Sequence, residues 1–595
     1  NQMRRTSIVL AVACLVTPLT NAADWSTWQS DSARSGYTTD ALPNELSRVW
    51  PWHPLHAPRP AWPRDDRMSF DRTNQVVVAD GLVCFGSSAD GKVSALDAAT
   101  GSQKWSYFTD GPIRFAPIVR KDRLFVVSDD GYLYCLKISD GTFVDRWRGG
   151  SADDRVLGNE QVISKWRARG GPVIHDGLLY WGAGIWQSEG VYIRAMNPDT
   201  GEMVWTNDSS GGIDMPQPHG GANAKSGVSA QGDMLANDDR LFVPTGRAVP
   251  AAFQRASGDF DYYRLQENTQ RGGTTAVLAN DLLYNGGYVY QTSDGSLLAD
   301  RVTGSVAAFP GGVVHGSSDQ LQLLAPVMKE TKDRKGDTIE VLSHEVVWQA
   351  KGVPAGTSLI IAADTVVSSG GNRLATINAK TGESIWSAEV DDVAYGLAVS
   401  DGRLFVSTAS GAIYCYAAAT ETEPIIHRSE PSSESPYADN EQITRAATEI
   451  LSKSHITAGY CVDLGCGDGH LAYELARQSD LFVVAVDSDP TNVATARRKL
   501  DAAGLYGSRV TVHEADLADT HLPKYFANLV VSNRSIGEGV ESVDAVEALR
   551  LQRPYGGVAC FGKHDEMPSE MHIVTRGALD GAGEWTHLYS NPANT

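Results

Sequence analysis

A glycine-rich segment near residue 465 is the part of the chain best suited to bind a small molecule. It reads Cys461-Val462-Asp463-Leu464-Gly465-Cys466-Gly467-Asp468-Gly469, an apolar run that ends in an acid and is followed by three alternate glycines. The apolar run predicts a strand, and Leu471, Leu475 and Ala476 predict an amphipathic helix directly after it. Glycines in such a turn let a ligand approach the backbone closely, and the free N–H groups of the helix favour an anion. The spacing differs from the Gly-x-Gly-x-x-Gly of dinucleotide sites.

Two further acids stand at the ends of predicted strands later in the chain. Asp487 follows the apolar run 481–486 and lies about 20 residues beyond the glycines, where a carboxylate can accept hydrogen bonds from both hydroxyls of a ribose. Asp516 follows a second segment, 510–515, which includes Val510 and Val512. A predicted helix, 491–503, separates the two segments. This alternation predicts a parallel, doubly wound α/β sheet.

The order of these segments resembles the class I methyltransferases that use S-adenosylmethionine. A further match is 553–558, which is close to the Pro-Gly-Gly turn before the fifth strand of that family. The resemblance implies that the glycine loop holds the amino acid end of S-adenosylmethionine, that Asp487 meets the ribose and that Asp516 meets the adenine amino group. The cofactor-binding residues that it implies are Asp463, Gly465, Cys466, Gly467, Gly469, Asp487, Ser488, Asp516 and Leu517.

The catalytic residues and the methyl acceptor are not identified by the sequence. Methyl transfer from a sulfonium is a direct displacement, so it can rely on proximity and orientation and needs no conspicuous catalytic side chain. Asn533 is a weak candidate, because it ends the predicted strand 529–533, whose end faces the acceptor in the relatives. Glu538 and His564 belong to the same side, although a surface or loop role is the simpler interpretation for all three residues.

Repeated segments fill the first two-thirds of the chain. The unit at Asp80 continues through Asp90-Gly91 and Thr100-Gly101 to Trp105, and predicts three short strands, a glycine hairpin and a fourth strand with the tryptophan. Glycine suits turns with positive φ, and tryptophan suits the space between neighbouring sheets. A spacing of about 40 residues is that of a propeller blade. Units begin near Asp80, Asp122, Gly177, Asp239, Asp281, Asp319, Ala363 and Asp401.

The last unit stops at Tyr416 without a tryptophan, and Ser47-Arg48-Val49-Trp50 near the N-terminus looks like the missing fourth strand. Closing the ring with strands from both ends would remove free edges. The combination of Asp-Gly, Thr-Gly and Trp resembles the pyrroloquinoline-quinone-like repeat family over roughly residues 25–418. The predicted fold is therefore an all-β, eight-bladed propeller followed by an α/β, Rossmann-like class I methyltransferase domain.

The propeller family contains quinone-dependent alcohol dehydrogenases and noncatalytic scaffolds such as outer-membrane assembly lipoproteins. The dehydrogenases carry two adjacent cysteines against the quinone and a calcium site, but no two of the seven cysteines here are adjacent. Pyrroloquinoline quinone is therefore not expected as a cofactor. The cysteines show no metal-ligand spacing, so no metal site is predicted, and Cys135 and Cys415 are expected to be buried in strands.

The ends and the charge of the chain bear on its location and partners. Arg4 and Arg5, the apolar run 8–16 and two small residues, Ala22 and Ala23, predict a cleaved secretion signal and export to the periplasm or cell envelope. Export would separate the protein from the cytoplasmic supply of S-adenosylmethionine. The net charge of −21 disfavours nucleic acid, and the basic cluster at 497–499 is interpreted as a solvated helix face. No transmembrane span is predicted.

The predicted organisation is a signal peptide (1–23), a propeller (24–418), a linker that reads as a tether (419–440), a methyltransferase-like domain (441–583) and a segment resembling the start of a second propeller (584–595). The leading hypothesis is a methyltransferase whose propeller docks an unknown protein partner or small-molecule substrate. The alternative is a noncatalytic scaffold with a repurposed methyltransferase fold, and a quinone dehydrogenase is a distant third.

Overall fold

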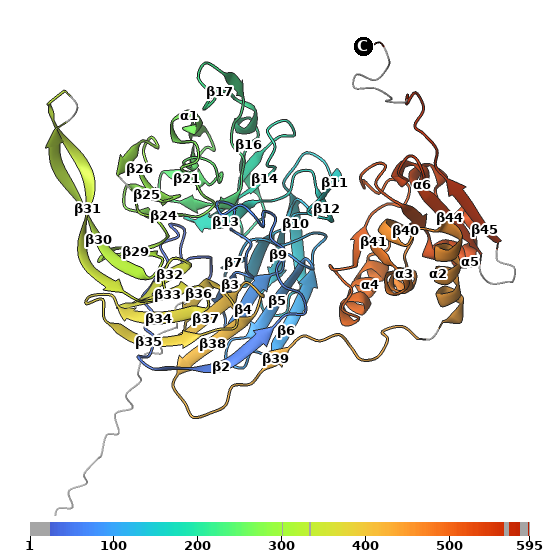
Figure 1. The fold of residues 1–595 in the computed structure, drawn as a ribbon, viewed down its shortest axis with the longest axis horizontal. Coiled ribbons are helices and arrows are strands. Elements are labelled where there is room, and N and C mark those ends of the chain that lie inside the picture. The colour runs from blue at the N-terminus through green and yellow to red at the C-terminus, as the bar shows by residue number, and fades with distance from the viewer. Residues whose placement is uncertain are drawn as a thin grey trace, which may run out of the picture.

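The computed structural model describes residues 24–299, 301–332, 335–438, 440–563, 570–583 and 593. The predicted signal peptide, His564 and all but one residue of 584–595 lie outside this part of the chain. Figure 1 shows an all-β ring and a smaller α/β domain at its side, joined by one long segment. None of the described helices is long and apolar enough to cross a membrane.

Eight antiparallel sheets radiate from the centre of the ring in the described residues, and each is one blade of the propeller. Listed from the innermost strand outward, the blades are: blade 1, β3 (Val76–Ala79), β4 (Leu82–Gly86), β5 (Lys92–Asp97) and β6 (Gln103–Phe108); blade 2, β7 (Ile118–Arg120), β8 (Arg123–Val127), β9 (Tyr132–Lys137) and β10 (Phe143–Arg148); blade 3, β13 (Gly170–His175), β14 (Leu178–Ala183), β15 (Tyr192–Met196) and β16 (Met203–Asn207); blade 4, β20 (Leu235–Ala236), β21 (Arg240–Val243), β22 (Ala251–Gln254) and β23 (Phe260–Tyr262); blade 5, β24 (Ala276–Ala279), β25 (Leu282–Asn285), β26 (Tyr288–Gln291) and β27 (Leu297–Ala299); blade 6, β28 (Ser305–Phe309), β29 (Gly312–Ser317), β30 (Gln320–Lys332) and β31 (Thr338–Lys351); blade 7, β32 (Ser358–Ala362), β33 (Thr365–Gly370), β34 (Arg373–Asn378) and β35 (Ser384–Glu389); blade 8, β36 (Ala394–Ser400), β37 (Arg403–Thr408), β38 (Ile413–Ala418) and β2 (Leu46–His53).

Short elements decorate the ring. Three short strands pair with blade strands: β1 (Tyr37–Thr38) with β32, β19 (Gly232–Asp233) with β13, and β39 (His427–Arg428) with β2. Two separate hairpins are formed by β11 (Arg155–Gly158) with β12 (Gln161–Ser164) and by β17 (Asp214–Pro216) with β18 (Asn223–Lys225). Two short helices, η1 (Ser210–Gly212) and α1 (Leu265–Asn268), lie in loops of this region.

The tryptophan of one blade covers the glycine turn of the next blade, which explains why both residues recur in the sequence. A Cβ on Gly141 of blade 2 would lie 2.5 Å from the Trp105 ring of blade 1, and the Trp105 indole donates to the Ile138 carbonyl at 2.8 Å. Gly141 has a φ of 71°, which L side chains rarely adopt. The same contact pairs Trp147 with Gly201, Trp205 with Gly258 and Trp348 with Gly382.

The strand β2 closes the ring as predicted. It pairs antiparallel with β38, with Trp50 opposite Cys415. Trp50 then covers Gly101 of blade 1 and donates to the Ala98 carbonyl at 3.2 Å. The N-terminal strand therefore makes the same contact between blades as the fourth strand of an ordinary repeat.

The sixth repeat begins one hairpin earlier than the sequence predicts. The first hairpin of blade 6 is the turn between β28 and β29, around Pro310 and Gly311, whereas Asp319 lies in the turn between β29 and β30. The Asp-Gly signature is absent from the first turn, and the two outer strands of this blade are long, at 13 and 14 residues. Because of these two features, the sequence signal near Asp319 marks the second hairpin of this blade and not the first.

Residues 25–38 form a segment that runs through the centre of the propeller, a feature absent from the sequence prediction. First strands of six blades donate backbone hydrogen bonds to it: Val78 to Trp25, Val119 to Ser26, Ala236 to Ser32, Leu278 to Ala33, Ala308 to Ser35 and Ile361 to Gly36. Arg34 is only 1% exposed and donates to Thr27 Oγ1 and to the carbonyls of Trp28, Pro172 and Met234. This central segment thereby connects seven of the blades.

The C-terminal domain has a six-stranded sheet in the order β42-β41-β40-β43-β44-β45 in the described residues. The first five strands in this order are parallel, and β45 runs antiparallel to β44, so the sheet is not wholly parallel. Its elements are α2 (Glu441–Ser454), β40 (Ala458–Leu464), α3 (His470–Gln478), β41 (Asp480–Asp487), α4 (Pro490–Ala502), β42 (Val510–Glu514), β43 (Leu529–Val531), α5 (Asn533–Glu538), η2 (Val540–Ser542), α6 (Ala545–Leu551), β44 (Val558–Lys563) and β45 (Glu570–Thr575).

The two faces of this sheet are covered differently. Helices α2, α3 and α4 pack on one face around a common apolar core. On the other face, α6 contributes Ala548 and Leu551, and Val162 of the propeller hairpin β11–β12 belongs to the same apolar cluster as Val484 and Val486. Gln161 and Val162 also line a small cavity together with Thr511 and His513 of β42. The propeller thus completes the second layer of the methyltransferase-like sheet.

Arg497 corrects the interpretation of its basic cluster as a solvated helix face. Its guanidinium is 8% exposed, forms an ion pair with Asp110 of the propeller and donates to the Val512 carbonyl at 2.8 Å. The charge of this neighbour, opposed by burial, lowers the pKa of Asp110. Nothing in the local sequence around 497 marks a partner more than 380 residues away.

The segment between the domains packs on both of them. Ile425 N donates to the Val49 carbonyl, and β39 pairs with β2 of blade 8. Ser432 N donates to the Ala502 carbonyl of α4 at 2.7 Å, and the buried Tyr437 joins the core of the C-terminal domain. The segment expected to be a tether is therefore held along much of its length.

Candidate functional site

The glycine loop follows β40 and turns sharply under the end of β41. Gly465, Gly467 and Gly469 have φ values of 77°, 57° and 85°. The amides of Gly465 and Cys466 both donate to the Val486 carbonyl, at 2.9 and 3.0 Å. A Cβ at Gly467 would lie 3.1 Å from Asn533 Nδ2, so that a side chain there would add crowding to an unfavourable backbone angle.

Asp487 holds the loop in place from the end of β41. Its Oδ2 accepts from Gly467 N at 2.8 Å, and its Oδ1 accepts from Asp489 N at 3.0 Å and from Asn492 Nδ2 at 3.2 Å. The carboxylate is 2% exposed. Asp487 therefore stabilises the glycine loop in the unliganded protein. Replacing it would disturb the loop as well as a ribose contact.

Asp463 lies beneath the loop with one oxygen unused. Its Oδ1 accepts from Asn533 N at 2.8 Å, while the buried Oδ2 has no hydrogen-bond partner in the described residues. Burial raises the pKa of Asp463 to about 7, and the nearby Asp487 charge adds to the shift. Asn533 Oδ1 is also buried without a partner in this part of the chain. Two acceptors beside the glycine loop thus lack a donor, and an ammonium group would supply one.

Four other predicted residues differ in their placement. Asp516 and Ser488 are exposed, and Asp516 Oδ1 accepts from Ala518 N at 2.9 Å. Leu517 is half-buried, and its Cδ1 would lie 3.5 Å from a Cβ on Gly465. Cys466 is fully buried in the core of α2, α3 and α4, so only its backbone belongs to the loop surface.

Gly469 serves packing in this structure. A Cβ on it would lie 3.1 Å from Ala496 Cβ, 3.1 Å from Tyr437 Oη and 3.2 Å from Leu500 Cδ1. The glycine therefore lets α3 and α4 approach each other at the foot of the loop. The structure places it behind the ligand-facing side.

The end of β43 brings Asn533 and Arg534 against the glycine loop. Arg534 N donates to the Gly465 carbonyl at 3.1 Å, and a Cβ on Gly465 would lie 3.2 Å from Arg534 Cβ. Glu538, at the last turn of α5, is exposed. Arg534 was not a sequence candidate, although its position directly after Asn533 at a strand end could have suggested it.

Tyr437 is a second residue that the sequence reading missed. Its hydroxyl donates to the Asp468 carbonyl at 2.9 Å, and its ring stacks on His470 with centroids 4.5 Å apart. Lys499 Nζ binds Asp468 Oδ2 at 2.7 Å and lies 4.7 Å from the centre of the Tyr437 ring. The segment between the domains thus fixes the outer side of the loop. Tyr437 was missed because it follows a Pro- and Ser-rich stretch.

The propeller cysteines Cys84, Cys135 and Cys415 are buried and unpaired, as expected for strand residues. Among the residues that the structure describes, no group of three or more His, Cys, Asp or Glu side chains is placed to hold a metal ion.

Comparison with family models identifies the two parts of the chain. A model described as "Outer membrane protein assembly factor BamB" matches residues 17–307, 188–458 and 370–481, which together span most of the chain. The chain belongs to this family of propeller proteins. A second model, described as a methyltransferase domain, matches residues 461–554, the region from the glycine strand to the turn before β44. A search of curated proteins found no match.

Solved structures resemble the two parts separately. The quinohemoprotein alcohol dehydrogenase of Comamonas testosteroni has 16% identity and a TM-score of 0.47, covering 72% of this chain and 85% of its own. BamB of Moraxella catarrhalis has 15% identity and a TM-score of 0.31, covering 63% of this chain and 100% of its own. A protein of Methanococcus maripaludis, assigned as an S-adenosyl-L-methionine-dependent methyltransferase, has 28% identity and a TM-score of 0.19, covering 21% of this chain and 56% of its own. With TM-scores below 0.5, these likenesses add nothing to the architecture described above.

Proposed function

We propose that the methyltransferase domain binds S-adenosylmethionine in the glycine loop and methylates an acceptor beside the end of β43, with the propeller as the docking module. The observation that carries the proposal is the buried, unpartnered Oδ2 of Asp463 beneath a loop whose three glycines have positive φ. A buried acceptor without a donor is costly, and a cationic ligand would offset that cost.

The residues present fit the cofactor. Asp463 Oδ2 and Asn533 Oδ1 would accept from its ammonium group, and the remaining lone pairs of Asp487 would accept from the ribose hydroxyls. Asp516 Oδ2, which has no hydrogen bond in the described residues, would accept from the adenine amino group, with Leu517 beside the ring. S-adenosylmethionine supplies, when bound, a methyl group on a sulfonium that a nucleophile can displace. On this proposal Asn533 and Arg534, which lie against Gly467 and Gly465, would orient that nucleophile.

Calorimetry with S-adenosylmethionine should use the full-length chain, because the propeller hairpin covers part of the methyltransferase sheet. Gly467→Ala should weaken binding more than tenfold, since the residue has a φ of 57° and its Cβ would crowd Asn533. Asp516→Ala should weaken binding by about tenfold or more, the loss of one charge-assisted hydrogen bond. Asp519→Ala is the matched control, an exposed acid of the same loop, and should bind like wild type. Absence of binding by the wild type at millimolar ligand would refute the site.

A noncatalytic scaffold is the second candidate function, supported by the match of residues 17–481 to the assembly-factor family. On this hypothesis the propeller binds an envelope partner, and the methyltransferase fold is retained for docking. Binding of S-adenosylmethionine without transfer of a labelled methyl group to any cell-envelope fraction would favour it. Transfer to a defined fraction would favour the enzyme.

The N-terminal sequence supports export of the chain. A fusion of residues 1–30 to a reporter that is active only outside the cytoplasm would test this. Cytoplasmic retention of the fusion would remove the conflict with the supply of S-adenosylmethionine.

A further inference from the structure

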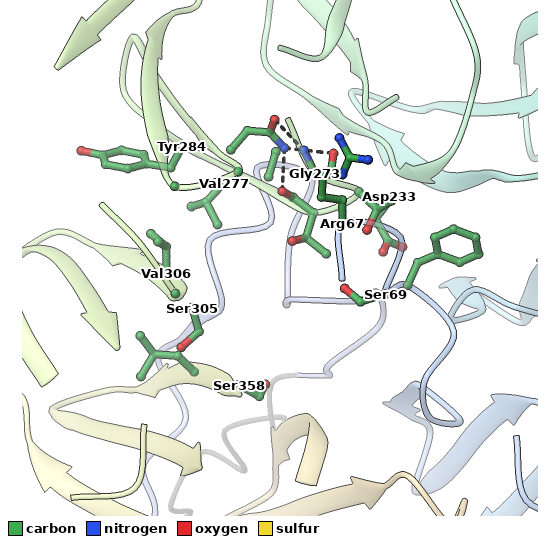
Figure 2. Close-up of a pocket in the computed structure, with 18 of the residues that line it drawn as sticks. Arg67, Ser69, Asp233, Gly273, Val277, Tyr284, Ser305, Val306 and Ser358 are labelled. Atoms are coloured by element: carbon green, nitrogen blue, oxygen red, sulfur yellow. Dashed lines mark hydrogen bonds between the residues drawn. The ribbon is translucent and has the colours of Figure 1, made fainter. Parts of the chain in front are cut away.

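We propose that a cavity beside the propeller axis binds a neutral, polyhydroxylated small molecule of the saccharide class. The cavity has a volume of about 460 Å³, which lies within the range of small-molecule sites. It is bounded by Trp28 and Gln29 of the central segment, by the loop around Ser69 and by the innermost strands of blades 5, 6 and 7. Figure 2 shows Ser69, Ser305 and Ser358 on different sides of this space.

The lining is dominated by hydroxyl and amide groups. They belong to Ser69, Thr274, Thr275, Thr303, Ser305, Thr357, Ser358, Gln29, Gln75, Gln270 and Asn285. Several glycines in the wall, such as Gly273 and Gly304, leave the backbone accessible. Such groups both donate and accept, and so do the hydroxyls of a sugar.

Three side-chain oxygens in the lining have no hydrogen-bond partner in the described residues, although each is buried. They are Gln29 Oε1, Thr274 Oγ1 and Ser305 Oγ. Buried polar atoms are normally paired, because an unpaired one forfeits its hydration without compensation. All three residues line the same cavity, and a ligand there would supply the missing partners once these side chains rotate toward it.

The position of Thr274 is fixed by its backbone. Thr274 N donates to the Arg67 carbonyl at 3.2 Å, and its carbonyl accepts from Asp233 N at 3.2 Å. On either side, Asn285 Nδ2 donates to Gly273 O at 3.2 Å and to Thr275 O at 2.8 Å. The backbone at Thr274 is therefore fixed before a ligand binds, and only its side chain has to rotate toward the cavity, which limits the entropic cost of binding.

The charges near the cavity favour a neutral ligand. At its mouth, Arg67 pairs with Asp65 at 3.4 Å and Asp66 pairs with Arg72 at 2.8 Å. Deeper in, Asp233 is buried, and burial raises its pKa to about 7, partly opposed by Arg34. No unpaired formal charge dominates the described lining, so a phosphate or a free carboxylate would gain little there.

Aromatic rings complete the site. Trp28, Phe70 and Tyr395 line the same cavity. An aromatic face packs well on the C–H face of a sugar ring, which the hydroxyls of the wall cannot do. The exposed residues Arg67, Thr303 and Gly356 mark the opening through which a ligand would enter.

The test uses the full-length protein with glucose, N-acetylglucosamine, maltose and cellobiose, followed by ligand-observed NMR and calorimetry. We expect at least one neutral saccharide to bind. Thr274→Val should weaken its binding by about three- to tenfold, the loss of one hydrogen bond. The melting temperature should not fall, because the Thr274 hydroxyl has no partner in the free protein. Ser305→Ala should behave likewise.

Thr376→Val is the matched control. Thr376 Oγ1 is also buried without a partner in the described residues, but it lies in β34, outside the cavity. Equal loss of binding in Thr274→Val and Thr376→Val would overturn the proposal, as would unchanged binding in Thr274→Val. Tighter binding of glucose 6-phosphate or gluconate than of every neutral sugar would assign the cavity to anions. Absence of any saccharide binding up to about 10 mM would also refute it.

Discussion

In the propeller, most blades contact a neighbour through the recurring aromatic cover, and seven of the eight contact the central segment through hydrogen bonds in the described residues. In the methyltransferase domain, one sheet face is covered by its own helices and the other partly by the propeller hairpin β11–β12. The propeller therefore makes its stabilising contacts within itself, whereas one face of the methyltransferase sheet is covered in part by the neighbouring domain. A repeated unit can hold its contacts locally, whereas a sheet with few helices on one face needs a neighbour to keep water away from it.

Among the changes that test this comparison, removal of residues 24–55 should have the largest effect on the stability of the propeller. The deletion takes away the central segment and β2, and so opens blade 8 and unpairs the first strands of several blades. We expect the propeller not to fold as a closed ring, measured as the loss of its cooperative thermal transition.

The variant Arg34→Met tests the central segment alone, because the closing strand β2 stays in place. The four hydrogen bonds of the buried guanidinium would be lost while β2 remains, and the cost should be about 3–5 kcal/mol in the free energy of unfolding. Arg403, whose side chain is 27% exposed and pairs with the exposed Asp401, provides the control, and its replacement by Met should cost less than about 1 kcal/mol. Equal stability of wild type and Arg34→Met would show that the segment does not hold the blades.

Asp110→Asn tests whether the second domain depends on the propeller. It leaves the guanidinium of Arg497 buried without its carboxylate, at a cost of about 3 kcal/mol to docking. Hydrogen exchange should increase in β42 and in β11–β12 but not in blades 4 to 7. Lys92→Ala removes the more accessible pair with Asp501, at 2.8 Å, and should change exchange little. Uniform exchange changes over the whole chain would contradict separate docking.

The pH dependence of ligand binding tests Asp463. Its pKa is raised to about 7 in the folded protein, so the carboxyl is largely protonated at pH 6 and must ionise to hold an ammonium group. Affinity for S-adenosylmethionine should therefore rise about tenfold from pH 6 to pH 8. Asp463→Asn should bind weakly and without this pH dependence.

The same shift has an opposite consequence for the unliganded fold. Because the folded pKa lies above the unfolded value, Asp463 makes the protein less stable as pH rises from about 4 through 7. Asp463→Asn can still accept the hydrogen bond from Asn533 N and should raise the melting temperature at pH 8. A variant that loses both stability and binding would indicate a structural role alone.

Tyr437→Phe should have the smallest effect. It removes one hydrogen bond to the Asp468 carbonyl, worth about 1 kcal/mol, and should weaken S-adenosylmethionine binding two- to fivefold. Tyr473 is the matched control, since its ring lies 4.9 Å from that of Tyr437 and its hydroxyl has no hydrogen bond within the described residues. Binding by Tyr473→Phe should equal that of wild type.

The sequence alone determined the features that repeat or follow a local pattern. The turn glycines, the aromatic fourth strands and the closing strand at Trp50 could be predicted because each blade repeats the same contacts. The strand order that brings Asp463 and Asp487 to one edge followed from alternating strands and helices. Where contacts recur with the sequence period, the repeat itself predicts which residues become neighbours.

Only the tertiary structure decided the contacts between distant segments. Arg34 at the propeller centre, Arg497 against Asp110 and Val162 on the methyltransferase sheet each have partners that no local pattern indicates. The same holds for the unpartnered oxygens of Asp463 and Thr274, because whether a polar atom is satisfied depends on everything packed around it. Periodicity specifies which face of an element is buried, but the partner on that face is chosen by the assembled fold.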